Sequence, residues 1–129
     1  MLKLKSIHHL AIICSDYAVS KKFYTDVLGF KIVKEVYRSE RNSYKLDLSL
    51  EGQYLIELFS FPDPPARITN PEASGLRHIE FEVSDIVQSV NELRQNGVFC
   101  ELIRIDEFTG KKFVFFSDPD GLPIELYES

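Results

Sequence analysis

Cysteine is scarce in this chain, with only Cys14 and Cys100 among 129 residues. The two residues form no CxxC motif and do not amount to a disulfide framework. We interpret both as reduced, structural residues.

Long apolar runs and excess positive charge are also missing. No run approaches the roughly 20 residues that span a bilayer. The opening segment M-L-K-L-K-S-I-H-H has no extended apolar core of the signal-peptide type. We therefore expect a cytoplasmic protein with no membrane partner. With 15 Lys and Arg against 20 Asp and Glu, the formal charge is −5, which argues against a nucleic-acid partner.

What is present fits one globular domain. Hydrophobic residues make up 44% of the chain and charged residues 27%. This composition is typical of a folded, soluble protein, and 129 residues are enough to bury a single core. We expect one domain over residues 1–129.

The chain contains an internal repeat. The segment His9–Asp16 (H-L-A-I-I-C-S-D) matches His78–Asp85 (H-I-E-F-E-V-S-D) at an offset of 69 residues. The segment Leu55–Phe59 (L-I-E-L-F) matches Pro123–Tyr127 (P-I-E-L-Y) at an offset of 68. This self-similarity predicts two diverged copies of one module, at about residues 5–61 and 76–129. Residues 62–75 carry four prolines and form the expected linker.

Each copy has the residue pattern of a βαβββ unit. Ser-Asp pairs at 15–16 and 84–85 predict helix N-caps, and Gly29 and Gly97 predict the helix ends. Alternating apolar runs predict the strands. In the first copy we expect strands at 7–14, 31–37, 44–50 and 53–59, and in the second at 77–83, 99–105, 112–117 and 122–127.

Two histidines and two glutamates occupy equivalent places in the repeat. Alternation along a strand places Glu57 and Glu125 on the face opposite their apolar neighbours. The same reasoning puts His9 and His78 on the side of these carboxylates. Such nitrogen and oxygen donors, without thiolate, suit one divalent metal ion: Zn²⁺, Ni²⁺, Mn²⁺, Co²⁺ or Fe²⁺. Four protein ligands would leave one or two positions for water or substrate.

Several segments carry a family resemblance: H-H-L-A-I-I-C-S-D, F-Y-T-D-V-L-G-F, G-L-R-H-I-E-F-E-V-S-D and D-P-D-G-L-P-I-E-L. Together they resemble the glyoxalase I-like branch of the vicinal oxygen chelate superfamily (glyoxalase I, bleomycin resistance and dioxygenase). The resemblance implies an α+β fold in which two pseudo-symmetric βαβββ modules form a cupped mixed sheet around a metal. It implies His9, Glu57, His78 and Glu125 as ligands, with Glu125 as the catalytic base and Glu57 as its symmetry mate.

The implied activity is that of a metal-dependent lyase or isomerase, acting on a small substrate chelated through vicinal oxygens. Glyoxalase I enzymes of this length carry an Arg and an Asn where this chain has Ile13 and Phe61. We therefore expect a substrate other than glutathione hemithioacetal. The alternatives are a thiol transferase of the fosfomycin-resistance type, an extradiol dioxygenase and a metal-free small-molecule binding protein of the same fold.

The remaining expectations concern assembly and the surroundings of the ligands. The resemblance implies a homodimer, with the metal site either within one chain or shared between two. We expect Glu80 and Glu82 at a solvated rim and His8 in a local hydrogen bond. Aromatic residues on the ligand side would line a pocket or an interface: Phe59, Phe113, Phe115 and Tyr127.

Overall fold

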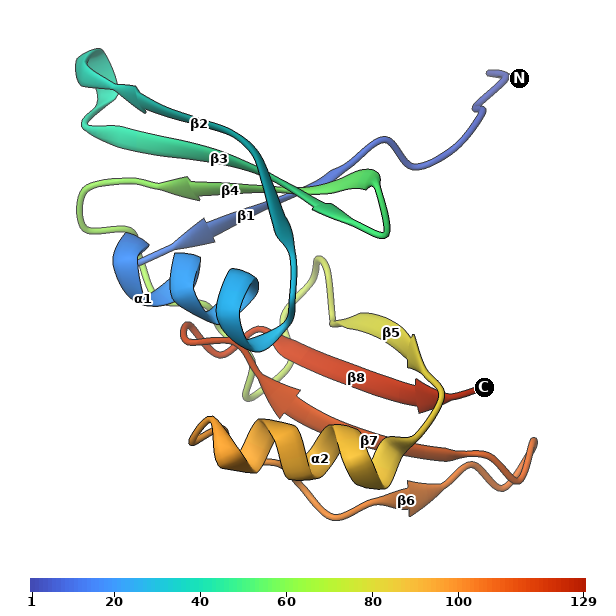
Figure 1. The fold of residues 1–129 in the computed structure, drawn as a ribbon. Helices are drawn as coiled ribbons and strands as arrows, with labels where there is room; N and C mark the ends of the chain where they lie inside the picture. Colours follow the sequence, from blue (N-terminus) through green and yellow to red (C-terminus); the bar gives the residue numbers. More distant parts are fainter. The chain divides into compact units, whose positions relative to one another are not determined.

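The computed structural model describes all 129 residues, and the chain divides into two compact units, Met1–Pro65 and Ala66–Ser129 (Figure 1). Each unit contains one four-stranded mixed sheet and one α-helix. The α+β class and the repeated βαβββ order predicted from the sequence are confirmed.

The first unit is built from four strands, one α-helix and two short helical turns. Its strand order is β1-β4-β3-β2, with β1 parallel to β4 and the other neighbours antiparallel. Its elements are β1 (Leu10–Cys14), α1 (Tyr17–Lys22), the π-helix η1 (Phe23–Val27), β2 (Lys31–Arg38), the 3₁₀ turn η2 (Ser39–Arg41), β3 (Ser43–Leu50) and β4 (Gln53–Ser60).

The second unit repeats this topology. Its strand order is β5-β8-β7-β6, and β5 is parallel to β8. Its elements are β5 (Ile79–Val83), α2 (Ile86–Gln95), β6 (Arg104–Ile105), β7 (Lys112–Ser117) and β8 (Pro123–Glu128).

Both helical segments begin where the sequence predicts. The second ends near Gly97 as expected, whereas in the first α1 ends at Lys22 and the π-helix η1 continues to Val27, two residues before Gly29. The Asp16 carboxylate accepts a hydrogen bond from the Val19 backbone N–H at 3.2 Å, and Asp85 does the same for Gln88 at 3.0 Å. These bonds satisfy first-turn amides that have no partner within the helix. Gly29 and Gly97 follow the helices with φ of 83° and 76°, a conformation that favours glycine.

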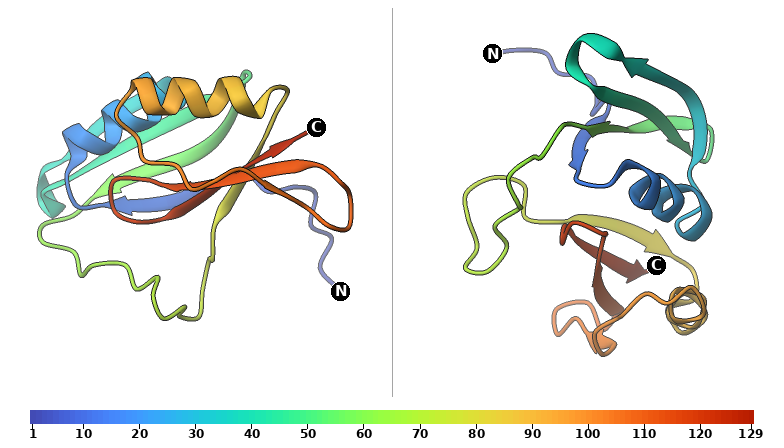
Figure 2. Two further views of the ribbon diagram at one scale, coloured as in Figure 1. Left: turned by 90° about the horizontal axis from the view of Figure 1, so that it is seen from below. Right: turned by 90° about the vertical axis from the view of Figure 1, so that its left-hand side faces the viewer.

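The core of each unit lies between its sheet and its helix. Ile56 and Leu58 of β4, and Ile124 of β8, have no exposed surface. Each helix covers one face of its own sheet (Figure 2). The glutamates Glu57 and Glu125 alternate with these core residues and therefore belong to the opposite face.

Two strand predictions need correction. β1 and β5 begin at Leu10 and Ile79, so the candidate histidines lie just before each strand rather than inside it. The strand expected at 99–105 is reduced to β6 and an isolated bridge between Cys100 and Phe116. Between them Leu102 is 81% exposed. An edge segment whose side chains are not buried gains little from pairing, so its backbone groups can hydrogen-bond to water instead.

None of the helices has the length and apolar character that crossing a membrane requires.

Candidate metal centre

Three side chains of the second unit converge at the start of β5 and the middle of β8. Ligand atoms of His78, Glu80 and Glu125 all lie within 4.8 Å of one another. His78 Nε2 is 3.4 Å from Glu125 Oε2. Glu80 and Glu125 are direct partners in the parallel pairing of β5 with β8, so the sheet itself brings the two carboxylates together.

Burial and a neighbouring carboxylate raise the pKa of Glu125. Its residue surface is only 8% exposed. Burial is the larger cause, and the hydrogen bond and repulsion from Glu80 add to it, so that the Glu125 pKa rises to about 7. The positive charges of Arg104 and Arg77 partly oppose this rise in the pKa. A divalent cation would replace the proton that this carboxylate pair otherwise holds.

The tautomer of His78 follows from its contact with Arg77. Arg77 Nη1 lies 3.1 Å from His78 Nδ1. A guanidinium group can only donate, so Nδ1 accepts and the neutral ring carries its proton on Nε2, facing Glu125. Coordination of a cation through Nε2 requires that proton on Nδ1 instead. Cation binding through Nε2 would therefore break this hydrogen bond, whereas the contact of Arg77 Nε with Glu72 at 2.7 Å would remain.

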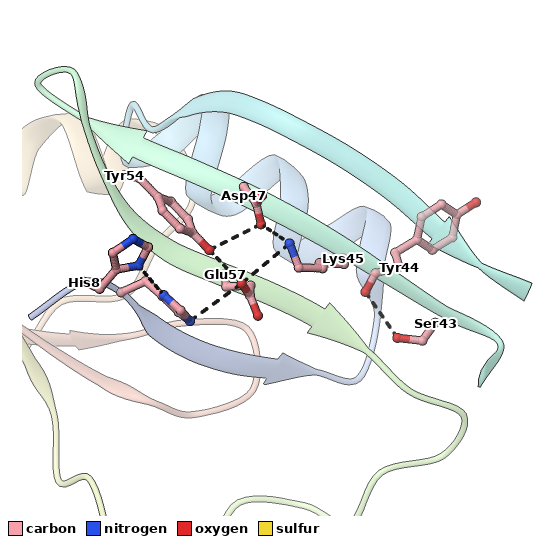
Figure 3. A network of polar contacts seen from close by, with 8 residues as sticks. His8, Ser43, Tyr44, Lys45, Asp47, Tyr54 and Glu57 are labelled. Atoms are coloured by element: carbon pink, nitrogen blue, oxygen red, sulfur yellow. Dashed lines mark hydrogen bonds and ion pairs between the residues drawn. The ribbon is translucent and has the colours of Figure 1, made fainter. Parts of the chain in front are cut away.

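The equivalent pair in the first unit is held by a denser set of contacts. His9 Nε2 lies 3.6 Å from Glu57 Oε2. The Tyr54 hydroxyl donates to Glu57 at 2.7 Å, and Lys45 Nζ lies 2.8 Å from Asp47 and 3.6 Å from Glu57 (Figure 3). Lys45 and the Tyr54 hydroxyl thus stabilise the negative charge of Glu57. Glu125, by contrast, lies beside another carboxylate, Glu80.

His8 and Tyr54 orient His9. The His9 ring stacks on Tyr54 with centroids 5.3 Å apart and 20° between the planes. His8 Nδ1 and His9 Nδ1 are 2.9 Å apart, so one nitrogen donates to the other. When His9 donates, its Nε2 lone pair is free toward Glu57, which is the tautomer a metal ligand needs. The local hydrogen bond expected of His8 is therefore made with the candidate ligand itself.

The structure thus joins each predicted histidine to its predicted glutamate, His9 to Glu57 and His78 to Glu125. Glu80 and Glu82 are both exposed, as expected of rim residues, and Glu80 also belongs to the cluster, whereas Glu82 stands outside it. The imidazole and carboxylate donors, with two carboxylates side by side, fit a divalent ion.

Other functional neighbours were not singled out from the sequence: Lys45, Tyr54, Arg77 and Arg104. The sequence pattern pointed to only one of the four. Lys45 alternates with Asp47 on β3, and Asp47 pairs with Glu57 on β4, so Lys45 belongs to the ligand face. Phe115, by contrast, lies on the expected side, with its ring edge-on to His78 at 5.3 Å.

Residues 6–126 match the family model described as the Glyoxalase/Bleomycin resistance protein/Dioxygenase superfamily. The chain belongs to this superfamily. Among its relatives, the uncharacterized protein YwkD of Bacillus subtilis is 63% identical, over 97% of this chain and 98% of YwkD. The metallothiol transferase FosB of Staphylococcus haemolyticus is 31% identical, over 96% of this chain and 84% of FosB.

A solved structure supports the same membership. The glyoxalase family protein from Enterococcus faecalis superposes with a TM-score of 0.89 and 49% identity, covering 96% of this chain and 98% of that one. The family name covers lyases, binding proteins and oxygenases, so the activity has to be argued from the site.

Proposed function

We propose that this superfamily member is a divalent-metal-dependent enzyme of glyoxalase I type. It would act as a lyase or isomerase on a small substrate that binds the metal through vicinal oxygens. The observation that carries the proposal is the His78, Glu80 and Glu125 cluster, in which a buried carboxylate lies beside a second carboxylate and an imidazole.

The proposed ligands are His9, Glu57, His78 and Glu125, one histidine and one glutamate from each copy of the repeat. The distances of 3.6 Å and 3.4 Å within the two pairs support this assignment. The donor set suits Zn²⁺, Ni²⁺, Mn²⁺, Co²⁺ or Fe²⁺. Glu80 would be a neighbour of these ligands rather than a fifth ligand.

When bound, the cation would polarise a substrate carbonyl and stabilise negative charge on its oxygens. The chain's own groups would handle the proton. Glu125 is the proposed base, because it is buried and lies beside His78 and Glu80. A bound cation would lower the pKa of this carboxylate, so Glu125 would have to leave the metal before it takes a proton.

The FosB relative favours one second candidate, a metal-dependent thiol transferase. That reaction type requires only two histidines and one glutamate, so Glu57 distinguishes the two candidates. If the chain is a thiol transferase, Glu57→Gln retains most activity, whereas a four-ligand lyase loses most of it. A metal-free binding protein would need none of these residues.

Metal content tests the proposal most directly. Plasma mass spectrometry on untagged protein should find about one divalent ion per chain in the wild type, and much less in Glu125→Ala. Glu82→Ala is the matched control, because Glu82 is an exposed glutamate on the same strand as Glu80. Absence of metal from the wild type, even after incubation with Ni²⁺, Zn²⁺ and Mn²⁺, would contradict the proposal and favour a metal-free binding protein.

A further inference from the structure

A cavity of about 300 Å³ lies wholly within the second unit. Its walls come from the segment 67–77, from residues 101 and 104, and from the facing ends of β7 and β8. This volume is at the lower end of small-molecule sites and suits a ligand of a few heavy atoms. Three guanidinium groups line it, those of Arg67, Arg77 and Arg104.

Arg67 brings a positive charge that no carboxylate neutralises. Its Nη2 donates to the backbone carbonyls of Leu76 at 2.6 Å and Arg77 at 3.2 Å, and its Nε donates to the Thr69 hydroxyl at 3.1 Å. Neutral oxygens therefore fix the side chain in place. A fixed, unpaired guanidinium in a concave wall attracts anions.

Arg104 is held by aromatic rings rather than by a strong ion pair. Its guanidinium carbon lies 5.0 Å from the centre of the Phe113 ring and 5.6 Å from that of Phe115. Its contact with Glu101 is a long one, at 3.7 Å. Stacking on ring faces leaves in-plane N–H groups available for an oxyanion.

Arg77 is compensated on one side only. Its Nε donates to Glu72 at 2.7 Å, and its Nη1 contacts His78 at 3.1 Å. Glu72 and Glu101 together supply two negative charges to this cavity against the three arginines. The cavity lining is therefore net positive in a chain whose overall charge is −5.

Phe115 connects the cavity to the candidate metal centre. It lines the cavity, it is the cross-strand partner of Glu125, and its ring meets His78 edge-on. A small molecule with its anionic end among the arginines would thus lie next to the His78, Glu80 and Glu125 cluster.

We propose that this cavity binds the anionic group of a small ligand, a carboxylate or a phosphoryl-type oxyanion, through Arg67, Arg77 and Arg104. That the ligand is the substrate rests on the proposed function. The substrate class would then be small acids whose vicinal oxygens adjoin the anionic group. Binding of the anion itself needs no metal.

Isotope-edited NMR titration of the metal-free full chain tests the proposal with three probes. Glycolate supplies a carboxylate, methylphosphonate supplies a phosphoryl-type oxyanion, and glycolamide is the uncharged match of glycolate. The two anions should shift amide signals of the segment 67–77 and of β7, and glycolamide should not. The anion that binds with the higher affinity identifies whether the cavity prefers a carboxylate or a phosphoryl-type group.

Two variants remove single charges from the cavity, Arg104→Gln and Arg77→Gln. Both arginine side chains are more than half exposed, so we expect the variants to fold. Each should weaken anion binding by roughly ten-fold or more, the scale of one charge-assisted hydrogen bond. Arg94→Gln is the matched control, because Arg94 belongs to α2 and does not line the cavity. Its anion affinity should equal that of the wild type.

The outcomes separate this inference from the proposed function. Equal binding of glycolate and glycolamide, or equal loss in Arg94→Gln and Arg104→Gln, overturns the anion site even if the chain holds a metal. Arginine-dependent anion binding in a chain that takes up no metal supports the cavity and contradicts the metal-dependent enzyme.

Discussion

Glu125 combines two features that rarely occur together in one glutamate. It is buried, and its nearest ionisable neighbours include another carboxylate, Glu80. Glu57, its repeat equivalent, instead has Lys45 and the Tyr54 hydroxyl as neighbours. The two halves of the repeat therefore differ in electrostatics. Glu125 has the environment of a group that exchanges protons, because burial and Glu80 raise its pKa to about 7.

We predict that Glu125 makes the stability of the metal-free protein fall as pH rises. Its pKa is about 7 in the folded chain and near the ordinary 4.5 when unfolded, so the folded state binds more protons between these values. The contribution is complete below about pH 4.5 and is lost as pH rises through about 7, on the order of 1–3 kcal/mol. Urea unfolding in EDTA, at pH 5 and pH 8, measures it.

Glu125→Gln should remove this part of the pH dependence, because the amide does not titrate. Glu82→Gln, the exposed control on β5, should keep the wild-type dependence. Identical pH profiles for wild type and Glu125→Gln would show that Glu125 titrates normally. Metal affinity should change in the opposite direction and rise with pH, since the cation displaces the proton.

At the scale of single residues, repetition in the sequence identified the four candidate ligands but not their surroundings. His9 and His78 are recognisable because each stands seven residues before an N-cap aspartate. Arg77 precedes His78 directly, yet nothing in the pattern shows that its guanidinium contacts Nδ1. Such contacts depend on side-chain rotamers, which local sequence does not determine.

At the scale of secondary structure, signals with a local cause were read correctly. The Asp16 and Asp85 caps and the glycines with positive φ follow from chain stereochemistry alone. β6 was overpredicted because Phe99, Leu102 and Ile105 give the segment an apolar character, although all three side chains are largely exposed. Burial is a tertiary property, and periodicity cannot report it for an edge segment.

The β3–β4 hairpin carries the polar network around Glu57 (Figure 3). We predict that Tyr54→Phe lowers metal affinity by about ten-fold, the scale of losing a hydrogen bond that orients a ligand. The phenyl ring should preserve stacking on His9, so the variant loses only the hydroxyl's hydrogen bonds, to Glu57 at 2.7 Å and to Asp47 at 3.4 Å. Competition with a fluorescent chelator measures the affinity.

Tyr37→Phe is the control for this prediction. The Tyr37 hydroxyl donates to Asn42, away from the network, and its removal should leave metal affinity unchanged. Tyr54→Leu, which also removes the ring, should cost more than Tyr54→Phe. Equal affinity in Tyr54→Phe and wild type would show that Glu57 needs no support from the hydroxyl.

At the scale of the whole molecule, the distribution of apolar surface indicates an association. Leu102 and Phe108 of the second unit are 81% and 90% exposed, and Phe99 is 81% exposed. Exposed apolar side chains that adjoin one another in a patch often mark an interaction surface, and the dimer prediction takes these three residues as its candidate patch. The sequence pattern placed Phe99 and Leu102 in an expected strand and gave no sign that their side chains are exposed.

We predict that the chain is a homodimer in which this surface is covered. Native mass spectrometry at micromolar concentration should give a mass of about 30 kDa, twice the 14.9 kDa of one chain. Leu102→Asp should raise the dimer dissociation constant by at least about ten-fold, because it places a charge in an apolar contact. Val87→Asp on α2, where Val87 is 50% exposed, is the control and should not change the dissociation constant.

A monomeric wild type would contradict the dimer. A dimer equally insensitive to both substitutions would place the interface elsewhere, and these apolar side chains would then have to be explained by a ligand or another partner.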